Sequence, residues 1–444
     1  MPEYKLSREE IFGGRLVAPM RKWLQKRGKV TKGYSYNDDM AIITHYLQNK
    51  DIEAYREKAI EKMKDYYRAL HSLDGDAPVA NEDAEAIFGG WDNSELCQMY
   101  KDNRSFTFVD LFAGIGGFRI ALEQLGGRCV YASEFNTAAQ ESYGRNHGVI
   151  PFGDITKDEN KELIPENVDV LCAGFPCQPF SLAGLRRGFT DQTKGTLFFD
   201  LAQIIQAKRP RIILLENVPG LMSIYNKDEQ GNRTDVKTIC TILDILRNEL
   251  HYNVPKPEIL NACHFGVPQN RDRVFIVGFR DIDDFLYRYP TGEGIEDVYF
   301  GEIREKGIVD AQYYMSNRYW HTLLAHREAQ REKGRGYGYC IVRDNEFGHT
   351  LMVGGMGLER NLVEDPNNLL ENVQDPRGEL NHDHIRVLTE QECARMQGFP
   401  KEFDIVSKKH AAYNQFGNSV AVPVVREVAR SLLDYTGIQH VEVD

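Results

Sequence analysis

The sequence lacks the features expected of membrane-spanning, secreted or metal-binding proteins. No apolar run reaches the roughly 18 residues that a membrane span needs, and the opening residues MPEYKLSREEIFGGRL contain no continuous apolar signal-peptide core. The 444 residues include eight cysteines, but no C-x-x-C pair and no Cys/His cluster with metal-ligand spacing. We therefore expect a cytoplasmic protein with no membrane partner, no metal and cysteines that are reduced thiols.

An excess of positive charge is also missing, because the formal net charge is −12. Such a charge opposes non-specific adhesion of the whole molecule to nucleic acid. Two regions differ from this average: residues 15–32 have seven basic side chains and no acidic one, and residues 318–343 mix Arg, Lys and His with Tyr and Trp. Each region is either a solvated face or part of a nucleic-acid contact.

The apolar pattern divides the chain into four segments. Residues 1–104 are highly charged and are predicted to form a helical N-terminal extension. In residues 105–280, short β-rich runs alternate with helical ones, which predicts an α/β fold with a doubly wound, mostly parallel sheet. Residues 281–400 are polar and weakly periodic and predict a smaller, irregular domain. Residues 401–444 end in an amphipathic helix that we expect to return to the sheet.

A glycine-rich turn follows the first predicted strand, FTFVDLF. The segment AGIGG places Gly114 and Gly116 as in a dinucleotide-binding fingerprint, but Arg119 occupies the third glycine position. What remains is a turn at a helix N-terminus where a ligand can approach the backbone, with Phe112 at its mouth. A purely structural tight turn is the alternative.

Two carboxylates follow the turn at positions suited to a nucleoside. Glu134 ends the next predicted strand, where a carboxylate can accept hydrogen bonds from ribose hydroxyls. Asp154, in PFGDIT, is positioned to accept a hydrogen bond from an amino group. Together with the turn, these residues predict a nucleoside site that needs no pyrophosphate.

The segment AGFPCQPFSLAG holds Cys177 between two prolines. Proline fixes φ and removes a backbone donor, so the segment is predicted to be a stiff loop. It follows the buried run VDVLCAGF, which places the thiol at the carboxyl edge of a parallel sheet, where ligands bind. A free cysteine is more often a small buried hydrophobic residue, but this setting favours an exposed, oriented nucleophile.

Three further charged residues end or begin apolar runs. Glu216 closes RIILLENV, where desolvation would keep a proton on its carboxyl group; a solvated or helix-capping glutamate is the alternative. In QNRDR, Arg271 and Arg273 are one residue apart and are expected to share one face of an extended segment. There they could bind a carbonyl oxygen or a phosphate together.

These motifs resemble those of the DNA (cytosine-5) methyltransferases of the prokaryotic modification type. Six blocks stand in that family's order within residues 106–280 and 385–430: DLFAGIGGF, GFPCQPFSLAG, ENV, QNRDR, RVLTEQECARMQGFP and YNQFGNSVAVPVV. The resemblance implies a catalytic and cofactor-binding domain over 105–280 and a target-recognition domain over 281–400. It also implies S-adenosyl-L-methionine as the cofactor.

The resemblance assigns roles residue by residue. The cofactor would be bound by Phe112, Gly114, Ile115, Gly116, Gly117, Glu134, Phe135, Asp154, Ile155, Leu197, Asn418, Ser419 and Val420. Phe135 stands where many members have tryptophan. Catalysis would use Cys177, Gln178, Glu216, Arg271 and Arg273, and Ser181 would contact DNA. The Cys177 sulfur would add to C6 of a flipped-out cytosine while Glu216 contacts N3 and Arg273 contacts O2.

The DNA sequence is expected to be read by residues 349–365. Thr350 and Leu351 match the Thr-Leu pair of the family's recognition domain, and Glu359, Arg360 and Asn361 have the donors and acceptors to read C, G and A. The alternative is a glycine-rich surface loop with a solvated charge cluster. Because every recognised motif follows Phe106, we expect the N-terminal extension to be dispensable for the chemistry.

The expected activity is methylation of cytosine C5 within a short duplex DNA sequence. The protein would act as a monomer on double-stranded DNA in a bacterial cytoplasm, with a cognate restriction endonuclease as a possible companion. Two alternatives stay open: an RNA cytosine-5 methyltransferase of the same fold, and a catalytically silent DNA-binding regulator.

Overall fold

The computed structural model describes residues 36–71, 73–86, 105–176, 197–228, 230–334, 338–353, 358–366, 378–407 and 409–443. The chain forms two compact units. The first comprises Met1–Glu258, Val274–Tyr289 and Ala429–Asp444, and the second comprises Ile259–Arg273 and Pro290–Val428. The first unit thus takes in the N-terminal segment, and residues 401–428 fall in the second.

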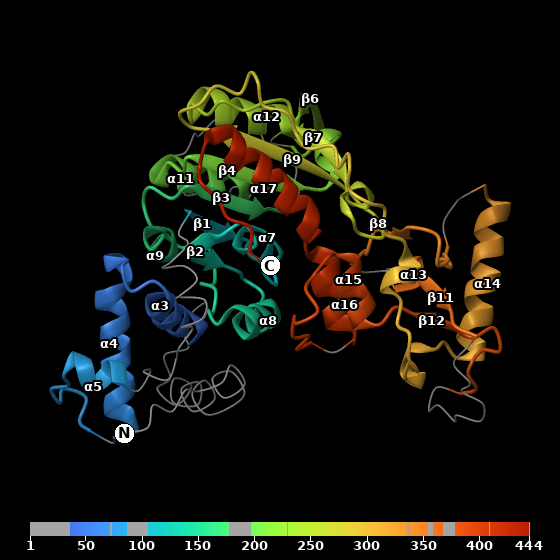
Figure 1. Ribbon diagram of the computed structural model, residues 1–444, viewed down its shortest axis with the longest axis horizontal. Coiled ribbons are helices and arrows are strands. Elements are labelled where there is room, and N and C mark those ends of the chain that lie inside the picture. Colours follow the sequence, from blue (N-terminus) through green and yellow to red (C-terminus); the bar gives the residue numbers. More distant parts are fainter. Residues whose placement is uncertain are drawn as a thin grey trace. The chain divides into compact units, whose positions relative to one another are not determined.

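The main sheet has six strands in the order β2-β1-β3-β4-β9-β7 (Figure 1), and it belongs to the first unit except for Ile259–Asn261 of β7 and the first two residues of β9. Its strands are β1 (Phe106–Leu111), β2 (Gly127–Ser133), β3 (Val170–Gly174), β4 (Ile212–Asn217), β7 (Glu258–Asn261) and β9 (Asp272–Phe279). The pairs β2–β1, β1–β3 and β3–β4 are parallel, and β9 runs antiparallel to β4. The predicted α/β fold with a mostly parallel sheet is therefore confirmed.

The remaining elements of this unit are helices and one small hairpin. The helices are α3 (Tyr36–Gln48), α4 (Glu53–Leu70), α5 (Asn81–Ala86), α7 (Gly117–Glu123), α8 (Thr137–His147), α9 (Asp158–Glu162), α11 (Leu197–Lys208), α12 (Thr238–Asp244) and the end of α17 (Val422–Thr436). Short helical turns are η2 (Pro219–Met222) and η3 (Ile245–Glu249), and the hairpin pairs β5 (Tyr225–Lys227) with β6 (Arg233–Lys237).

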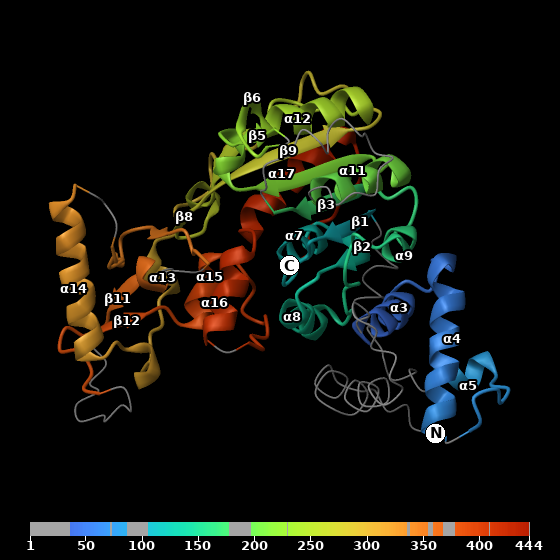
Figure 2. The same ribbon diagram turned by 180° about the vertical axis from the view of Figure 1, so that it is seen from behind.

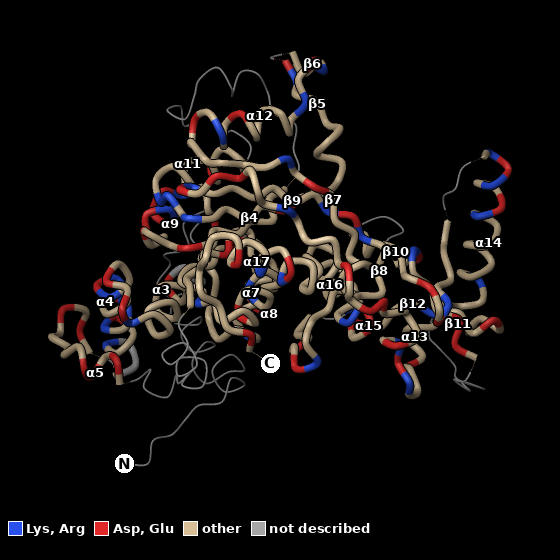
Figure 3. Tube along the Cα trace, turned by 45° about the horizontal axis from the view of Figure 1, so that its top comes forward, with Lys and Arg blue, Asp and Glu red and all other residues tan. Residues whose placement is uncertain are grey.

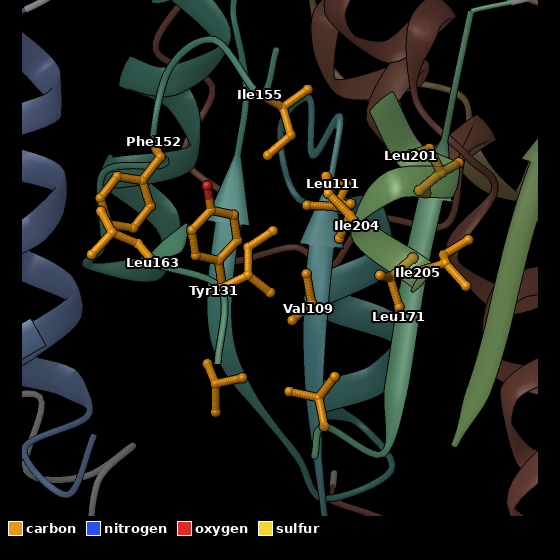
Figure 4. Close-up of a cluster of buried hydrophobic side chains, with 14 of the residues drawn as sticks. Val109, Leu111, Tyr131, Phe152, Ile155, Leu163, Leu171, Leu201, Ile204 and Ile205 are labelled. Atoms are coloured by element: carbon orange, nitrogen blue, oxygen red, sulfur yellow. The ribbon is translucent and has the colours of Figure 1, made fainter. Parts of the chain in front are cut away.

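Alternate strand residues face two different layers of helices. On one face, Val109, Leu111 and Leu171 pack with Leu201 and Ile204 of α11 (Figure 4). On the other face, Asp110 of β1 and Tyr143 of α8 are joined by a hydrogen bond. The side-chain period of two in a strand produces this division. Figure 2 shows the α11 side of the sheet.

The N-terminal helices α3 and α4 belong to the core of the first unit. Ile43, Tyr55 and Met63 are fully buried in the same apolar cluster as the sheet residues. Side chains of these helices also bond to β2, which is the edge strand: the Tyr55 hydroxyl donates to the carbonyl of Val130 at 2.5 Å. The predicted helical character of the N-terminal segment is confirmed, and these helices cover an edge strand whose backbone groups need partners.

The second unit has a smaller core around a two-stranded antiparallel ribbon. Its strands and helices are β8 (Gln269–Asn270), β10 (Gly348–His349), β11 (Leu362–Glu364), β12 (Ile385–Val387), α13 (Phe300–Ile303), α14 (Asn317–Glu332), α15 (Glu390–Met396), α16 (Lys409–Asn418) and the start of α17, with turns η4 (Ala262–Phe265), η5 (Ala311–Tyr313) and η6 (Leu358–Arg360). Trp320 of α14 packs with Leu362 of β11 and Ile385 of β12. The fully buried Arg386 is held by carboxylates of Asp365 and Glu392 at 2.9 and 2.8 Å.

Charge on α14 is mixed in sign. Figure 3 shows acidic and basic residues interleaved along this helix, and Arg331 lies 4.0 Å from Glu328. Arg327 stacks over the ring of Tyr339, with 4.6 Å from Cζ to the ring centroid. The other basic region, residues 15–32, lies outside the described residues. Within the described ranges, no helix is long and apolar enough to cross a membrane.

Candidate active site

The glycine-rich turn joins β1 to α7 in a conformation that needs glycine. Gly114 and Gly116 have φ values of 57° and 93°, and Phe112 shares a positive φ of 55°. A Cβ on Gly116 would lie 2.1 Å from Nε2 of His147, whereas a Cβ on Gly114 would meet open space. The His147 side chain therefore fills the space beside Gly116, whereas the space beside Gly114 is open. An open glycine lets a ligand approach the backbone closely.

Glu134 lies beside this turn and is tied to it. One carboxylate oxygen accepts from the backbone N–H of Gly114 at 2.8 Å, and the other accepts from that of Asn136 at 2.7 Å. Burial raises the pKa of Glu134, and these two hydrogen bonds counteract the shift. The turn and the carboxylate thus form one preorganised unit.

The other residues expected around the cofactor differ in exposure. Phe135 is 77 % exposed, so its ring face is free to stack on a ligand. The Asp154 carboxylate accepts from the backbone and hydroxyl of Thr156 at 3.0 and 2.7 Å. Ile115 and Ile155 are buried, Gly117 begins α7, and Leu197 is half-buried at the start of α11.

Arg119 explains why the dinucleotide fingerprint is broken. Its side chain is fully buried under the turn, where Nε donates to Glu123 at 2.7 Å and Nη1 donates to the Tyr143 hydroxyl at 3.5 Å. Tyr143 in turn donates to Asp110 at 3.5 Å. Burial raises the pKa of Asp110 to about 7, although the Arg119 charge opposes this. A third glycine would leave this buried carboxylate without its cation.

Glu216 ends β4 next to the end of β3. Gly174 is its register partner, and a Cβ on Gly174 would lie 3.4 Å from Oε2 of Glu216. Glu216 as a residue is 8 % exposed, in agreement with the buried position expected from the sequence. Cys177, Gln178 and Ser181 lie outside the described residues, but Gly174 precedes Cys177 by only three positions.

Asn217 is a residue whose role the sequence reasoning missed. Its side-chain amide donates to the carbonyl of Phe175 at 2.7 Å, and its oxygen accepts from the N–H of Val218 at 2.8 Å. Asn217 thereby fixes the chain two residues before Cys177. Its place in the block ENV was the only signal in the sequence.

Arg271 does not share a ligand with Arg273, and that expectation is corrected. Its side chain is 2 % exposed, and Nη2 donates to the carbonyls of Gly417 and Ser419 at 3.0 and 2.6 Å. Nη1 donates to the carbonyl of Leu351 at 3.4 Å. Arg273 is half-buried, and its Nη1 donates to the carbonyl of Asp272. The structure gives Arg271 a positioning role.

Two glutamines complete the network around Arg271. Gln269 accepts from the N–H of Leu351 at 3.0 Å and donates to the carbonyl of Met396 at 2.8 Å. Gln397 donates to the carbonyl of Phe416 at 2.6 Å. The sequence reasoning missed both residues, although each lies in a recognised block. The network holds residues 417–420, which we call the GNSV segment. Within it, Ser419 and Val420 are buried and Asn418 is exposed.

The residues expected to read DNA do not all face outward. Leu351 is 1 % exposed. Glu359 is buried and accepts from the Tyr319 hydroxyl at 2.7 Å. Asn361 is fully buried, with its amide bonded to both the N–H and the carbonyl of His349 at 2.7 and 3.0 Å. These three residues are therefore corrected to structural roles, because their polar groups or side chains are used inside the unit.

The side chains of two of the residues expected to read DNA, Thr350 and Arg360, are partly exposed. Thr350 is half-buried and donates to the carbonyl of Asn270 at 2.8 Å. Arg360 is half-buried. The glycines at 354, 355 and 357 lie outside the described residues. Because Glu359 and Asn361 are bonded internally, Arg360 is the remaining base-reading candidate among residues 359–361.

Comparison with known proteins agrees with this geometry. Residues 106–434 match the model of the family described as C-5 cytosine-specific DNA methylase. The chain is 47 % identical over 336 residues to the type II methyltransferase M.HpaII of Haemophilus parainfluenzae, covering 75 % of this chain and 90 % of that protein. It is 34 % identical over 340 residues to M.HhaI of Haemophilus parahaemolyticus, covering 75 % and 95 %.

A solved structure shares the fold. The S. pombe Dnmt2 methyltransferase aligns with a TM-score of 0.54 and 20 % identity, covering 74 % of this chain and 99 % of that one. With the matched residues spanning the sheet, the turn and the GNSV segment, the chain belongs to the C-5 cytosine-specific DNA methylase family.

Proposed function

We propose that this DNA cytosine-5 methyltransferase acts through a covalent bond between the Cys177 sulfur and C6 of a cytosine flipped out of duplex DNA. The observation that carries the proposal is the position of Glu216. Its carboxyl group lies over Gly174, at the end of the strand that leads directly into Pro176 and Cys177. The proposed nucleophile therefore comes just after β3, and the buried acid lies at the same end of the neighbouring parallel strand β4.

The chain's own groups divide the chemistry among them. The Cys177 thiolate adds to C6, and Glu216, protonated in its desolvated position, donates to N3. Arg273 donates to O2, so that electron density collects at C5. After the methyl group has been accepted, a base removes the C5 proton and the thiolate leaves from C6. The C5 proton passes to the base, the N3 proton returns to Glu216 as the sulfur leaves C6, and the thiolate is regenerated, so that atoms and charge balance.

S-adenosyl-L-methionine supplies the methyl group when it is bound. The residues present fit a nucleoside ligand: Gly114 opens to space, Phe135 offers an exposed ring, and Glu134 lies against the turn. Glu134 would accept from the ribose hydroxyls and Asp154 from the adenine amino group. The exposed Asn418, with Ser419 and Val420, would close over the ligand.

The test is to trap the covalent intermediate. Duplex DNA containing 5-fluorocytosine has no C5 proton to lose, so the wild-type protein should form a denaturation-resistant adduct with it in the presence of S-adenosyl-L-methionine. Mass mapping should locate the adduct at Cys177, and Cys177→Ala should form none while still binding the cofactor. Absence of any adduct would overturn the mechanism. The same assay on tRNA tests the RNA alternative.

The cellular setting is part of the proposal. The curated relatives are type II methyltransferases, which supports a role beside a cognate restriction endonuclease, in the cytoplasm and as a monomer on double-stranded DNA. Bisulfite sequencing of DNA from cells that express the chain would identify the methylated sequence. Resistance of that DNA to an endonuclease cutting the same sequence would support the pairing.

A further inference from the structure

The N-terminal helix α3 reaches the two segments that carry the proposed cofactor carboxylates. His45 is 1 % exposed, and its Nε2 accepts from the backbone N–H of Ala132 at 3.1 Å. Ala132 lies two residues before Glu134 on β2. The neighbouring Thr44 is fully buried, and its hydroxyl oxygen accepts from the N–H of Ile150 at 3.1 Å. Ile150 lies four residues before Asp154.

The tautomer of His45 follows from its partners. Its Nδ1 lies 2.8 Å from the carbonyl of Ala41, which can only accept, so Nδ1 carries the proton and Nε2 is free to accept. Burial lowers the pKa of His45 to about 3, so the ring stays neutral in this position. The Thr44 hydroxyl likewise donates to the carbonyl of Met40 at 2.9 Å. Both side chains are therefore oriented by their own helix.

Aromatic packing links the same two segments. The ring of Phe152, two residues before Asp154, lies 4.5 Å from that of His45 between centroids. Phe152 also stacks on Tyr131 of β2, with 4.8 Å between the ring centroids and 12° between the ring planes. Figure 4 shows the two side chains next to each other. The Phe152 carbonyl accepts from the N–H of Glu134 at 2.8 Å. Any shift of His45 would thus move the backbone that leads to both carboxylates.

We infer that Thr44 and His45 are positioning residues for the cofactor site, which set the affinity for S-adenosyl-L-methionine by holding Glu134 and Asp154 in register. The inference rests on the proposed cofactor-binding function. It gives helix α3, which contains no recognised motif, a role in cofactor binding. Neither side chain needs to touch the cofactor, because each acts through the backbone of β2 or of residues 150–152.

Two matched pairs of substitutions in the full chain test this inference. His45→Phe keeps a ring of similar size but leaves the Ala132 N–H without an acceptor, whereas His45→Gln retains an acceptor at that distance. Thr44→Val removes the acceptor for Ile150 without changing the shape, and Thr44→Ser retains it. We expect His45→Phe and Thr44→Val to raise the Kd and KM for S-adenosyl-L-methionine about tenfold, the effect of one buried hydrogen bond. The kcat at saturating cofactor should stay within about twofold.

Titration calorimetry with S-adenosyl-L-methionine gives the Kd, and tritiated methyl transfer to duplex DNA gives KM and kcat. His45→Gln and Thr44→Ser should restore most of the affinity. Met63→Ala is the control for stability, because Met63 is fully buried in α4 and makes no hydrogen bond to these segments. Met63→Ala should lower the melting temperature without changing the Kd.

Three outcomes distinguish the claims. Unchanged Kd values in folded His45→Phe and Thr44→Val proteins would overturn the inference. A rise in Kd that Met63→Ala reproduces at equal loss of stability would also overturn it, because the effect would then be general destabilisation. Failure of the wild-type chain to bind S-adenosyl-L-methionine would instead contradict the proposed function.

Discussion

The guanidinium group of Arg271 lies 2.6 Å from the carbonyl oxygen of Ser419, although 148 residues separate them in the sequence. With a second bond to Gly417, this contact fixes the segment proposed to close over the cofactor. A buried cation here donates to backbone carbonyls, and the Ser419 carbonyl accepts besides only a longer bond from Gln397 at 3.4 Å among the described residues. Arg271 and its neighbour Arg273 therefore have different roles.

Substitution at these two arginines should separate stability from rate. Arg271→Ala removes the donor at 2.6 to 3.4 Å from three backbone carbonyls and should lower the free energy of unfolding by about 2–3 kcal/mol, with a raised KM for the cofactor. Arg273→Ala should leave the melting temperature nearly unchanged and lower kcat. Urea denaturation and steady-state kinetics measure both. Equal loss of stability in the two variants would contradict this division.

Glu216→Gln should slow methyl transfer without abolishing cofactor binding. The amide cannot supply the proton that the proposed contact with N3 requires, and loss of one preorganised transition-state contact typically reduces the rate on the order of 10²- to 10³-fold. Single-turnover methyl transfer at saturating DNA and cofactor is the measurement. Near-normal turnover would mean that the buried carboxyl group has only a structural role.

Asp110 should make stability depend on pH. Because its pKa is raised to about 7 in the folded state from about 4 in the unfolded chain, folding takes up a proton between these values. Its contribution to the free energy of unfolding therefore falls as pH rises from about 4 to about 7. In Asp110→Asn this contribution is absent.

The stability difference between Asp110→Asn and the wild type should consequently shift in favour of the variant from pH 5 to pH 8, on the order of 2 kcal/mol. Urea denaturation of both proteins at the two pH values measures it, and other titrating groups cancel in the difference. A difference independent of pH would show that Asp110 is ionised throughout.

Arg360→Ala should relax the preference for one base pair of the target. A specific base contact is worth roughly 1–3 kcal/mol of discrimination, and Arg360 is the half-buried member of a trio whose other members are bonded internally. Sequencing of methylated sites in the product reads out the change. An unchanged site at reduced yield would indicate a phosphate contact instead.

Asn361→Ala is the matched control for this experiment. Its amide bonds to the backbone of His349 on both sides, so the substitution should lower stability by about 1–3 kcal/mol without changing the sequence preference. A changed preference in Asn361→Ala at full stability would restore that residue to base reading.

A chain beginning at Lys101 should not stay folded at 37 °C. It would lose the buried residues Ile43, Tyr55 and Met63 and expose the edge of β2, including the carbonyl of Val130 to which Tyr55 donates. Size-exclusion chromatography and a thermal melt of the truncated chain test this. A soluble, monomeric product with the wild-type melting temperature would show that the helices are dispensable after all.

The sequence by itself determined the sheet, the glycine turn and the carboxylates at its edge. Strand periodicity, glycine spacing and the order of motif blocks are local properties, so Gly114, Glu134 and Glu216 could be recognised without coordinates. The same local patterns identified the family, and the proposed role of Cys177 rests on that resemblance.

Only the tertiary structure decided which polar residues face a ligand and which are used inside. Arg271, Glu359 and Asn361 have the same chemistry as ligand-binding residues, but their partners lie 148, 40 and 12 residues away in the sequence. The helices α3 and α4 likewise carry no motif, and their role follows from covering the edge strand β2. Burial and hydrogen-bond satisfaction depend on contacts between distant segments, and no local pattern encodes those contacts.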